Sequence, residues 1–190
     1  KKNNESMKSV ILDLRGNGGG LLHEAVNVVN TFVKKGELVV KTLGRDQENN
    51  RTYNTLDAPT DLEIPLVVLI DNGSASASEI VAGALQDYGR AKLVGVVSYG
   101  KGSVQNWIPL SGDNGAVRIT IAKWLTPNEH TIHEIGLTPD VFVEMTEEDY
   151  IAKLDHQLDA AIETLLAMIS GNPIPTSMPT AVPSAVPTQP

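Results

Sequence analysis

Two short, nearly continuous apolar runs constrain most strongly what this chain can fold into. They occupy residues 10–14 (VILDL) and 65–70 (PLVVLI), and such runs are typical of buried strands. Each is followed by a loop rich in Gly or Ser and then by apolar residues at helical spacing, over 22–33 and 80–88. Together with a strand-like segment at 92–97, the order strand, helix, strand, helix, strand predicts an α/β fold with parallel crossovers.

The rest of the chain divides into a folded part and two polar ends. We expect a polar lead-in at 1–8, a core at 9–169 and a disordered or polyproline-type tail at 170–190, which holds six of the 11 prolines and no charge. Within the core, shorter patterns predict further elements. These are a strand at 38–40, a polar loop or hairpin at 44–62, two strands at 104–110 and 116–124 around a turn, an edge strand at 140–143 and a helix at 151–168.

Composition excludes several classes of function. The absence of cysteine excludes a disulfide framework, a zinc ribbon and a thiol nucleophile. A net charge of −8, from 15 basic and 23 acidic residues without a basic cluster, argues against nucleic acid as the main partner. The sequence contains no run of about 18 apolar residues, so no membrane span is predicted. The chain starts at Lys1 and a strand begins by Ser9, so we interpret it as a fragment of a longer protein.

Ser76 lies where a nucleophile can be activated, between a buried strand and a helix. Free backbone N–H groups and the positive end of the helix dipole stabilise a developing oxyanion there. Ser76 and Glu79 also fit a capping box. On this motif alone, helix capping is a more frequent reason for a serine at this position than catalysis. No G-x-S-x-G elbow surrounds Ser76, so a Ser-His-Asp triad is open but unsupported. The candidate histidines are His23, His130, His133 and His156.

Lys101 is the other candidate base, in a Gly-Lys-Gly segment that permits a sharp turn. A lysine base has to be uncharged, which burial in an apolar pocket favours; a solvated loop lysine is the ordinary alternative. The stretch from Gly95 to Lys101 almost matches a phosphate-binding P-loop. However, Gly102 replaces the Ser or Thr that holds magnesium, and a strand follows instead of a helix.

The glycine-rich segment 16–20 follows the first strand and opens a helix. Its spacing does not fit G-x-G-x-x-G, so a dinucleotide site is not predicted. Clustered N–H donors at such a turn can hold an anion, a substrate backbone or an oxyanion. A tight strand-to-helix turn without further function is the alternative.

Taken together, these segments resemble the carboxyl-terminal processing peptidases, the tail-specific proteases of serine peptidase family S41. The resemblance is carried by DLRGNGGG at 13–20, SASASE at 74–79 and YGKGSVQ at 99–105, in that order, and extends over about 10–166. It implies an α/β core of the ClpP/crotonase type. It also implies a PDZ domain upstream of the chain and a location in the cell envelope of the full-length protein.

The resemblance also implies roles for five residues. Ser76 corresponds to the nucleophile, Lys101 to the general base and Gln105 to the residue that positions the lysine. The backbone N–H groups of Gly20 and Ala77 correspond to the oxyanion hole. The implied protein is a serine endopeptidase that cleaves proteins near their C-termini through an acyl-enzyme, without metal or cofactor. A non-catalytic peptide-binding relative is the main alternative, and a nucleotide-binding domain the weaker one.

Overall fold

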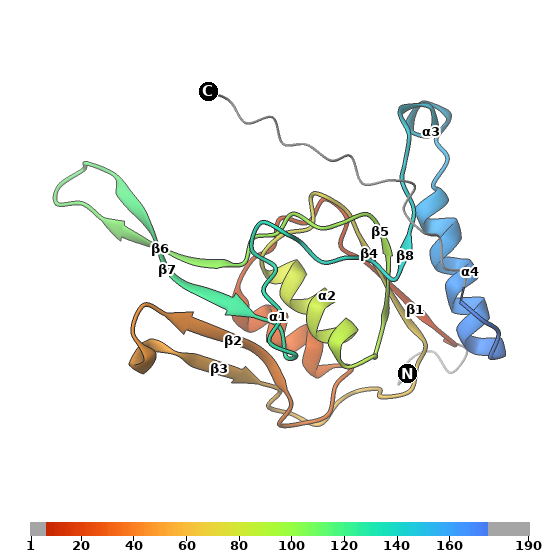
Figure 1. Ribbon diagram of the computed structural model, residues 1–190, viewed down its shortest axis with the longest axis horizontal. Helices are drawn as coiled ribbons and strands as arrows, with labels where there is room; N and C mark the ends of the chain where they lie inside the picture. Colours follow the sequence, from red (N-terminus) through yellow and green to blue (C-terminus); the bar gives the residue numbers. More distant parts are fainter. Residues whose placement is uncertain (1–6, 175–190) are drawn as a thin grey trace.

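The computed structural model describes residues 7–174, and two four-stranded sheets organise them (Figure 1). The first sheet is parallel throughout, in the order β1-β4-β5-β8. Its strands are β1 (Val10–Asp13), β4 (Leu66–Ile70), β5 (Lys92–Gly95) and β8 (Val141–Phe142). This arrangement confirms the predicted α/β fold with parallel crossovers and the short edge strand.

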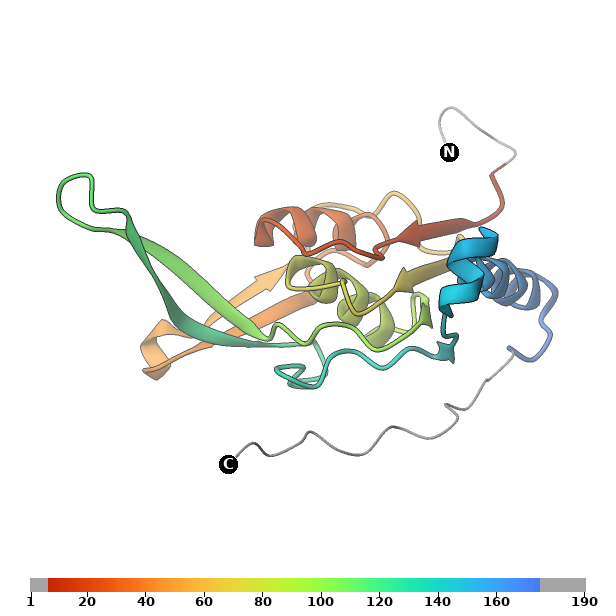
Figure 2. The same ribbon diagram turned by 90° about the horizontal axis from the view of Figure 1, so that it is seen from above.

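The central strand β4 is buried on both faces, which explains its continuous apolar sequence. Successive side chains of a strand point to opposite faces. Leu66, Val68 and Ile70 pack in the cluster that contains helices α1 (Leu22–Asn30) and α2 (Ala77–Asp87). Val67 and Leu69 pack in the other cluster, with Ala161 and Leu165 of α4 (His156–Ser170). Helices therefore cover both faces of the parallel sheet, as Figure 2 shows.

The second sheet is antiparallel and has the order β3-β2-β7-β6. Its strands are β2 (Leu38–Gly44), β3 (Arg51–Asn54), β6 (Ser103–Pro109) and β7 (Ala116–Leu125), with a short 3-10 helix, η1 (Gln47–Asn49), between β2 and β3. The predicted hairpin at 104–124 is confirmed, and the polar region 44–62 contains the β2–β3 hairpin. The β6–β7 hairpin extends well beyond the helices in both views (Figures 1 and 2).

Two predicted helices differ from the observed ones. The helix predicted at 151–168 is two helices, α3 (Glu147–Ala152) and α4, because Lys153 adopts a left-handed conformation (φ 56°) and Asp155 caps α4. The first helix ends at Asn30 instead of Val33. No described helix is long and apolar enough to cross a membrane. The expected tail lies outside the described residues from position 175 onward, as does most of the lead-in.

Candidate active site

The three motif segments meet because each follows one of three neighbouring strands. The glycine-rich segment follows β1, the serine-rich segment follows β4, and the segment containing Lys101 follows β5. Since β1, β4 and β5 are adjacent and parallel, their carboxyl ends lie at one edge of the sheet, where ligand sites of open α/β sheets form. The fold therefore brings together segments that are up to about 80 residues apart in the sequence.

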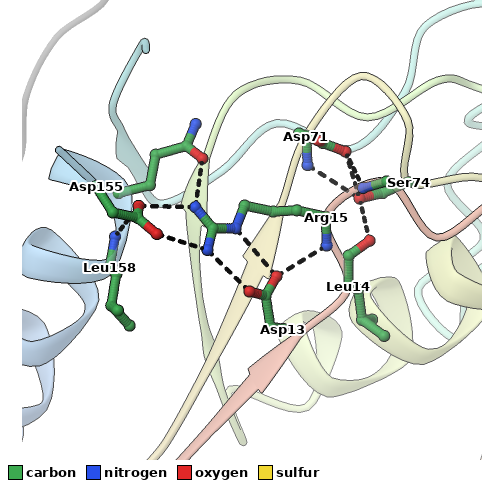
Figure 3. A network of polar contacts seen from close by, with 9 residues as sticks. Asp13, Leu14, Arg15, Asp71, Ser74, Asp155 and Leu158 are labelled. Atoms are coloured by element: carbon green, nitrogen blue, oxygen red, sulfur yellow. Dashed lines mark hydrogen bonds and ion pairs between the residues drawn. The ribbon is translucent and has the colours of Figure 1, made fainter. Parts of the chain in front are cut away.

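Hydrogen bonds fix the first two segments to each other (Figure 3). The Asp71 Oδ1 atom accepts the backbone N–H of Gly16 (2.8 Å) and of Gly73 (2.9 Å). The Ser74 hydroxyl donates to the Leu14 carbonyl at 2.8 Å and is completely buried. The start of the glycine-rich loop is thus held against the turn that precedes Ser76.

Arg15 extends this network to the last helix (Figure 3). Its guanidinium donates to both carboxylate oxygens of Asp155 (2.8 and 2.9 Å) and to both of Asp13 (3.0 and 2.8 Å). It also donates to Gln157 Oε1 at 3.2 Å. Hydrogen bonding to Arg15 lowers the pKa of both carboxyl groups, and these bonds raise the pKa of Arg15 further. The glycine-rich loop is therefore joined to the N-terminus of α4.

Gly19 lies close against the segment that contains Ser76. Its φ of +97° lies in the region that favours glycine, and an added Cβ would lie 2.5 Å from the Ala75 carbonyl oxygen and 2.8 Å from the Ala77 nitrogen. The Gly19 N–H is bound to Asn17 Oδ1 at 3.0 Å. In contrast, the N–H of Gly20 has no partner among the described residues, so it is available to a substrate.

Ser76 is the N-cap of α2 and has an unusual backbone conformation (φ 56°, ψ −117°). A non-glycine residue held there stores about 1–3 kcal/mol of strain, and such residues gather at functional sites. The capping-box prediction is confirmed: Glu79 accepts the Ser76 N–H at 2.8 Å, and the Ser76 side chain faces the Glu79 N–H. The second contact does not reach hydrogen-bond geometry, and the Ser76 hydroxyl has no other partner among the described residues.

The Glu79 carboxylate connects this segment to the one that carries Lys101. It is fully buried, and besides the Ser76 N–H it accepts the Ser98 hydroxyl (2.6 Å) and the backbone N–H groups of Gly100 (2.7 Å) and Lys101 (2.9 Å). Four donors on one buried carboxylate fix the nucleophile and lysine segments in one arrangement. These bonds also occupy two N–H groups that a P-loop would offer to phosphate, and strand β6 follows, so the nucleotide alternative loses its basis.

Lys101 is half-buried, and its backbone N–H and C=O are both hydrogen-bonded. Its N–H donates to Glu79, and its carbonyl accepts the indole N–H of the buried Trp124 at 2.9 Å. The Lys101 amine forms no hydrogen bond or ion pair with the described residues, and none joins it to Ser76. Contacts between catalytic groups are often long in a free enzyme and shorten when substrate binds.

One cavity of about 280 Å³ collects all five residues singled out in the sequence, namely Gly20, Ser76, Ala77, Lys101 and Gln105. The remaining lining is Leu21, Leu22, Ile80, Ser103, Val104, Trp107, Arg118 and Trp124. Three successive residues of β6, Ser103, Val104 and Gln105, line it, and the strand has a register shift between Val104 and Gln105. The Gln105 amide donates to Thr120 Oγ1 at 3.3 Å, not to the lysine, so its positioning role stays a prediction.

None of the four histidines lines this cavity. His23, His130 and His156 lie on the surface beside the carboxylates of Glu24, Asp87 and Asp149, respectively. The fourth, His133, lines an adjoining hollow that shares Lys101, Ser103, Gln105 and Arg118 with this cavity. A Ser-His-Asp triad therefore finds no support, and no group of three potential metal ligands occurs among the described residues.

Comparison with known proteins settles the family. The model of "Peptidase family S41" matches residues 1–143, three quarters of the chain. The chain belongs to peptidase family S41. Among its relatives, a carboxy-terminal-processing protease of Bartonella bacilliformis is 51% identical over 140 residues, which are 74% of this chain and 32% of that protein. A probable CtpA-like serine protease of Staphylococcus aureus is 44% identical, over 76% of this chain and 29% of that protein.

Solved structures of other proteins share the fold. The photosystem II D1 C-terminal processing protease superposes with a TM-score of 0.66 at 37% identity, over 75% of this chain and 36% of that one. Mature CPAF gives 0.72 at 15% identity, which shows a shared fold only. The predicted family is therefore confirmed, and so is the fold class. The chain spans about a third of the length of the relatives it matches.

Proposed function

We propose that this chain is the catalytic core of a serine endopeptidase that cleaves protein substrates near their C-termini. One observation carries the proposal: Ser76 and Lys101 line one cavity together with Gly20 and Ala77. The names of the S41 relatives, carboxy-terminal-processing and CtpA-like proteases, support the same substrate class.

The chemistry follows from what each group can do. The uncharged Lys101 amine takes the proton of the Ser76 hydroxyl while its oxygen attacks the scissile carbonyl carbon. The negative charge that develops on the carbonyl oxygen is stabilised by the N–H groups of Ala77 and Gly20. The Lys101 ammonium then protonates the departing amine, which leaves an acyl ester on Ser76. Water, deprotonated by the same amine, hydrolyses this ester and restores both residues.

Separate substitutions of the two residues test the mechanism. In the full-length protein, Ser76→Ala and Lys101→Ala are each expected to abolish peptide cleavage and to leave the unfolding midpoint close to that of the wild type. A fluorophosphonate probe, which acylates activated serines, should add its mass to the peptide containing Ser76 only in the wild type. Undiminished cleavage by either variant would contradict the Ser/Lys dyad.

A non-catalytic peptide-binding relative remains the second candidate, because no hydrogen bond joins Ser76 to Lys101 in this structure. The two candidates differ in one measurement: a peptide-binding relative retains the peptide intact and leaves Ser76 unlabelled by the probe. For the full-length protein we further propose a PDZ domain that binds the substrate C-terminus and a location in the cell envelope, as the S41 relationship implies. Fractionation of cells that produce the tagged full-length protein tests the location.

A further inference from the structure

The cationic lining of the catalytic cavity is unexpected in an acidic chain. The protein carries 23 acidic and 15 basic residues, a net charge of −8. Yet the charged residues that line the cavity with Ser76 are Lys101 and Arg118, and none of its described lining residues is acidic. With Lys101 uncharged in the reaction, Arg118 remains the fixed charge beside the scissile bond.

Arg118 is held in this place by the β6–β7 hairpin. It lies directly opposite Trp107 in the strand register, and its guanidinium is 5.7 Å from the centroid of the Trp107 ring. This cation–π contact orients the guanidinium and leaves its N–H groups to a ligand, since Arg118 is exposed and donates no hydrogen bond to the described residues. Arg118 and Trp107 together form one wall of the cavity.

A second cavity, of about 550 Å³, adjoins the first on the side of β2 and β3. The two share Leu22 and Val104, and the second is lined by Arg45 and Arg51 with no acidic residue among the described ones. One guanidinium nitrogen of Arg51 donates hydrogen bonds to the carbonyls of Glu48 and Asn50. The charge of Arg51 and its other N–H donors stay available to a ligand. Three arginines thus line a path made of two adjoining cavities, the first of which contains Ser76.

The other hollows beside the site contain acidic residues. The hollow on the α1 side includes Glu24, and the one beyond Lys101, which shares Lys101 and Arg118 with the catalytic cavity, includes Glu134. Among the described hollows next to the catalytic cavity, the one towards the β2–β3 hairpin therefore combines positive charge with the absence of acidic residues. An extended peptide advances about 3.3 Å per residue, so a side chain a few residues from the scissile bond can reach this path.

We propose that the path lined by Arg118, Arg45 and Arg51 selects substrates with carboxylate groups a few residues from the scissile bond, on one side of it. The proposal rests on the proposed function, because the first cavity of the path contains Ser76. Arginine binds carboxylates through two parallel N–H donors, which gives geometric selectivity that a lysine does not supply. Acidic side chains and the carboxylate of a nearby C-terminus share this chemistry, and the test separates them.

The test compares matched peptides that differ in one carboxylate. One series places a single Glu or Gln at each of the four residues before and after the scissile bond, with an amidated C-terminus. A second series is neutral and ends in a free carboxylate or an amide. For the full-length protein we expect Glu to raise kcat/KM about twofold to fivefold over Gln, and on one side of the scissile bond only. This range is the one expected for a partly exposed ion pair. Because salt screens such pairs, the gain should shrink in 0.5 M salt.

Variants assign the effect to the arginines. Arg118→Gln, and separately Arg45→Gln with Arg51→Gln, should lower the ratio of Glu to Gln rates towards one, and Arg118→Glu should reverse the preference. The exposed Lys35, which lines none of these cavities, is the matched control, and Lys35→Gln should keep the wild-type ratio. A gain confined to the free C-terminal carboxylate would identify the terminus as the ligand. Equal rates in both series would overturn the proposal.

A binding measurement keeps the inference separate from the proposed function. The anisotropy of fluorescein-labelled Glu and Gln peptides is titrated with the Ser76→Ala protein, which needs no cleavage. Tighter binding of the Glu peptide, lost on adding Arg118→Gln, supports the carboxylate site even if the wild type cleaves no peptide. Equal affinities would overturn it even if the wild type cleaves both.

Discussion

Glu79 is the residue on which the relative position of Ser76 and Lys101 depends most. Its buried carboxylate accepts four hydrogen bonds, and a glutamine in its place offers one accepting oxygen and an NH₂ group that cannot accept. Buried donors left without an acceptor destabilise a protein by about 1–3 kcal/mol each. We therefore expect Glu79→Gln to lower the free energy of unfolding by about 2–4 kcal/mol, measured by urea denaturation.

A matched control exists for this substitution. Glu24 is the third residue of α1, as Glu79 is of α2, but its side chain is 63% exposed. Glu24→Gln should change the free energy of unfolding by less than about 0.5 kcal/mol. Equal effects of the two substitutions would mean that Glu79 acts only as an ordinary capping residue.

Gly19 and Gly18 give a second matched pair at the residue scale. A Cβ at Gly19 would overlap the backbone of the segment containing Ser76, whereas one at Gly18 meets nothing within 4 Å. We expect Gly19→Ala to displace that backbone and to slow fluorophosphonate labelling of Ser76 on the order of 10- to 100-fold, since small displacements in a catalytic site have effects of this size. Gly18→Ala should be labelled at nearly the wild-type rate. Normal labelling of the Gly19→Ala protein would show that the contact is not needed.

At the scale of elements, Arg15 and Asp155 join the glycine-rich loop to α4. Asp155 also caps the helix by accepting the Leu158 N–H at 2.9 Å. Asparagine caps helices as well as aspartate does, so Asp155→Asn removes the ion pair and keeps the cap. Because Asp155 is 37% exposed, solvent screens the pair, and we expect a loss of about 0.5–1 kcal/mol at pH 7. The exposed Glu163 supplies the control Glu163→Gln, for which no loss is expected.

The difference in the free energy of unfolding between the wild type and Asp155→Asn should depend on pH in one direction. Arg15 lowers the pKa of Asp155 below its ordinary value of 3.8, so the ionised carboxyl stabilises the folded state above that pH. This stabilisation disappears as the pH falls through the lowered pKa. Urea denaturation at pH 7 and again below pH 3 should therefore show the wild type and Asp155→Asn converging in acid. A difference that persists in acid would mean that the charge of Asp155 is not its origin.

The sequence predicts best those elements whose residue pattern has one structural explanation. The strand β4 is apolar at every position because both of its faces are buried, and the β6–β7 hairpin follows from two strand-like segments around a polar turn. The break between α3 and α4 was missed because the apolar spacing continues across it. The signal was Asp155, a favourable N-cap residue three positions before Leu158.

The candidate site was predicted less completely than the fold. The local positions of Ser76 and Lys101 make them candidates, and the resemblance to family S41 gives them roles. The adjacency of β1, β4 and β5 explains why the motif segments meet. Glu79 was recognised only as a capping residue, because a local pattern cannot show bonds to Ser98, Gly100 and Lys101, 19–22 residues further along. Arg118 was missed for a related reason: its place beside Lys101 depends on how the β6–β7 hairpin pairs.

At the scale of the whole molecule, stability should be concentrated in the parallel sheet. Leu66–Ile70 of β4 is completely buried between two layers of helix. The outer part of the β6–β7 hairpin is exposed on both faces, including Trp107, Ile108, Val117 and Ile119. Segments with few buried contacts open locally at little free-energy cost, whereas central strands open only when the whole domain unfolds.

Hydrogen exchange followed by mass spectrometry measures this difference in the protein in solution. We expect amides of β4 to exchange more slowly than those of residues 107–118 by at least a factor of about 100. Peptides that bind along the path between the hairpins should slow exchange around Arg118 in the Ser76→Ala protein and leave β4 unchanged, because only the former contacts the ligand. If the hairpin without peptide were protected as strongly as β4, its outer part would not be exposed in solution, and another surface would have to cover its apolar side chains. Such protection would weaken on dilution if a second copy of the chain provided that surface.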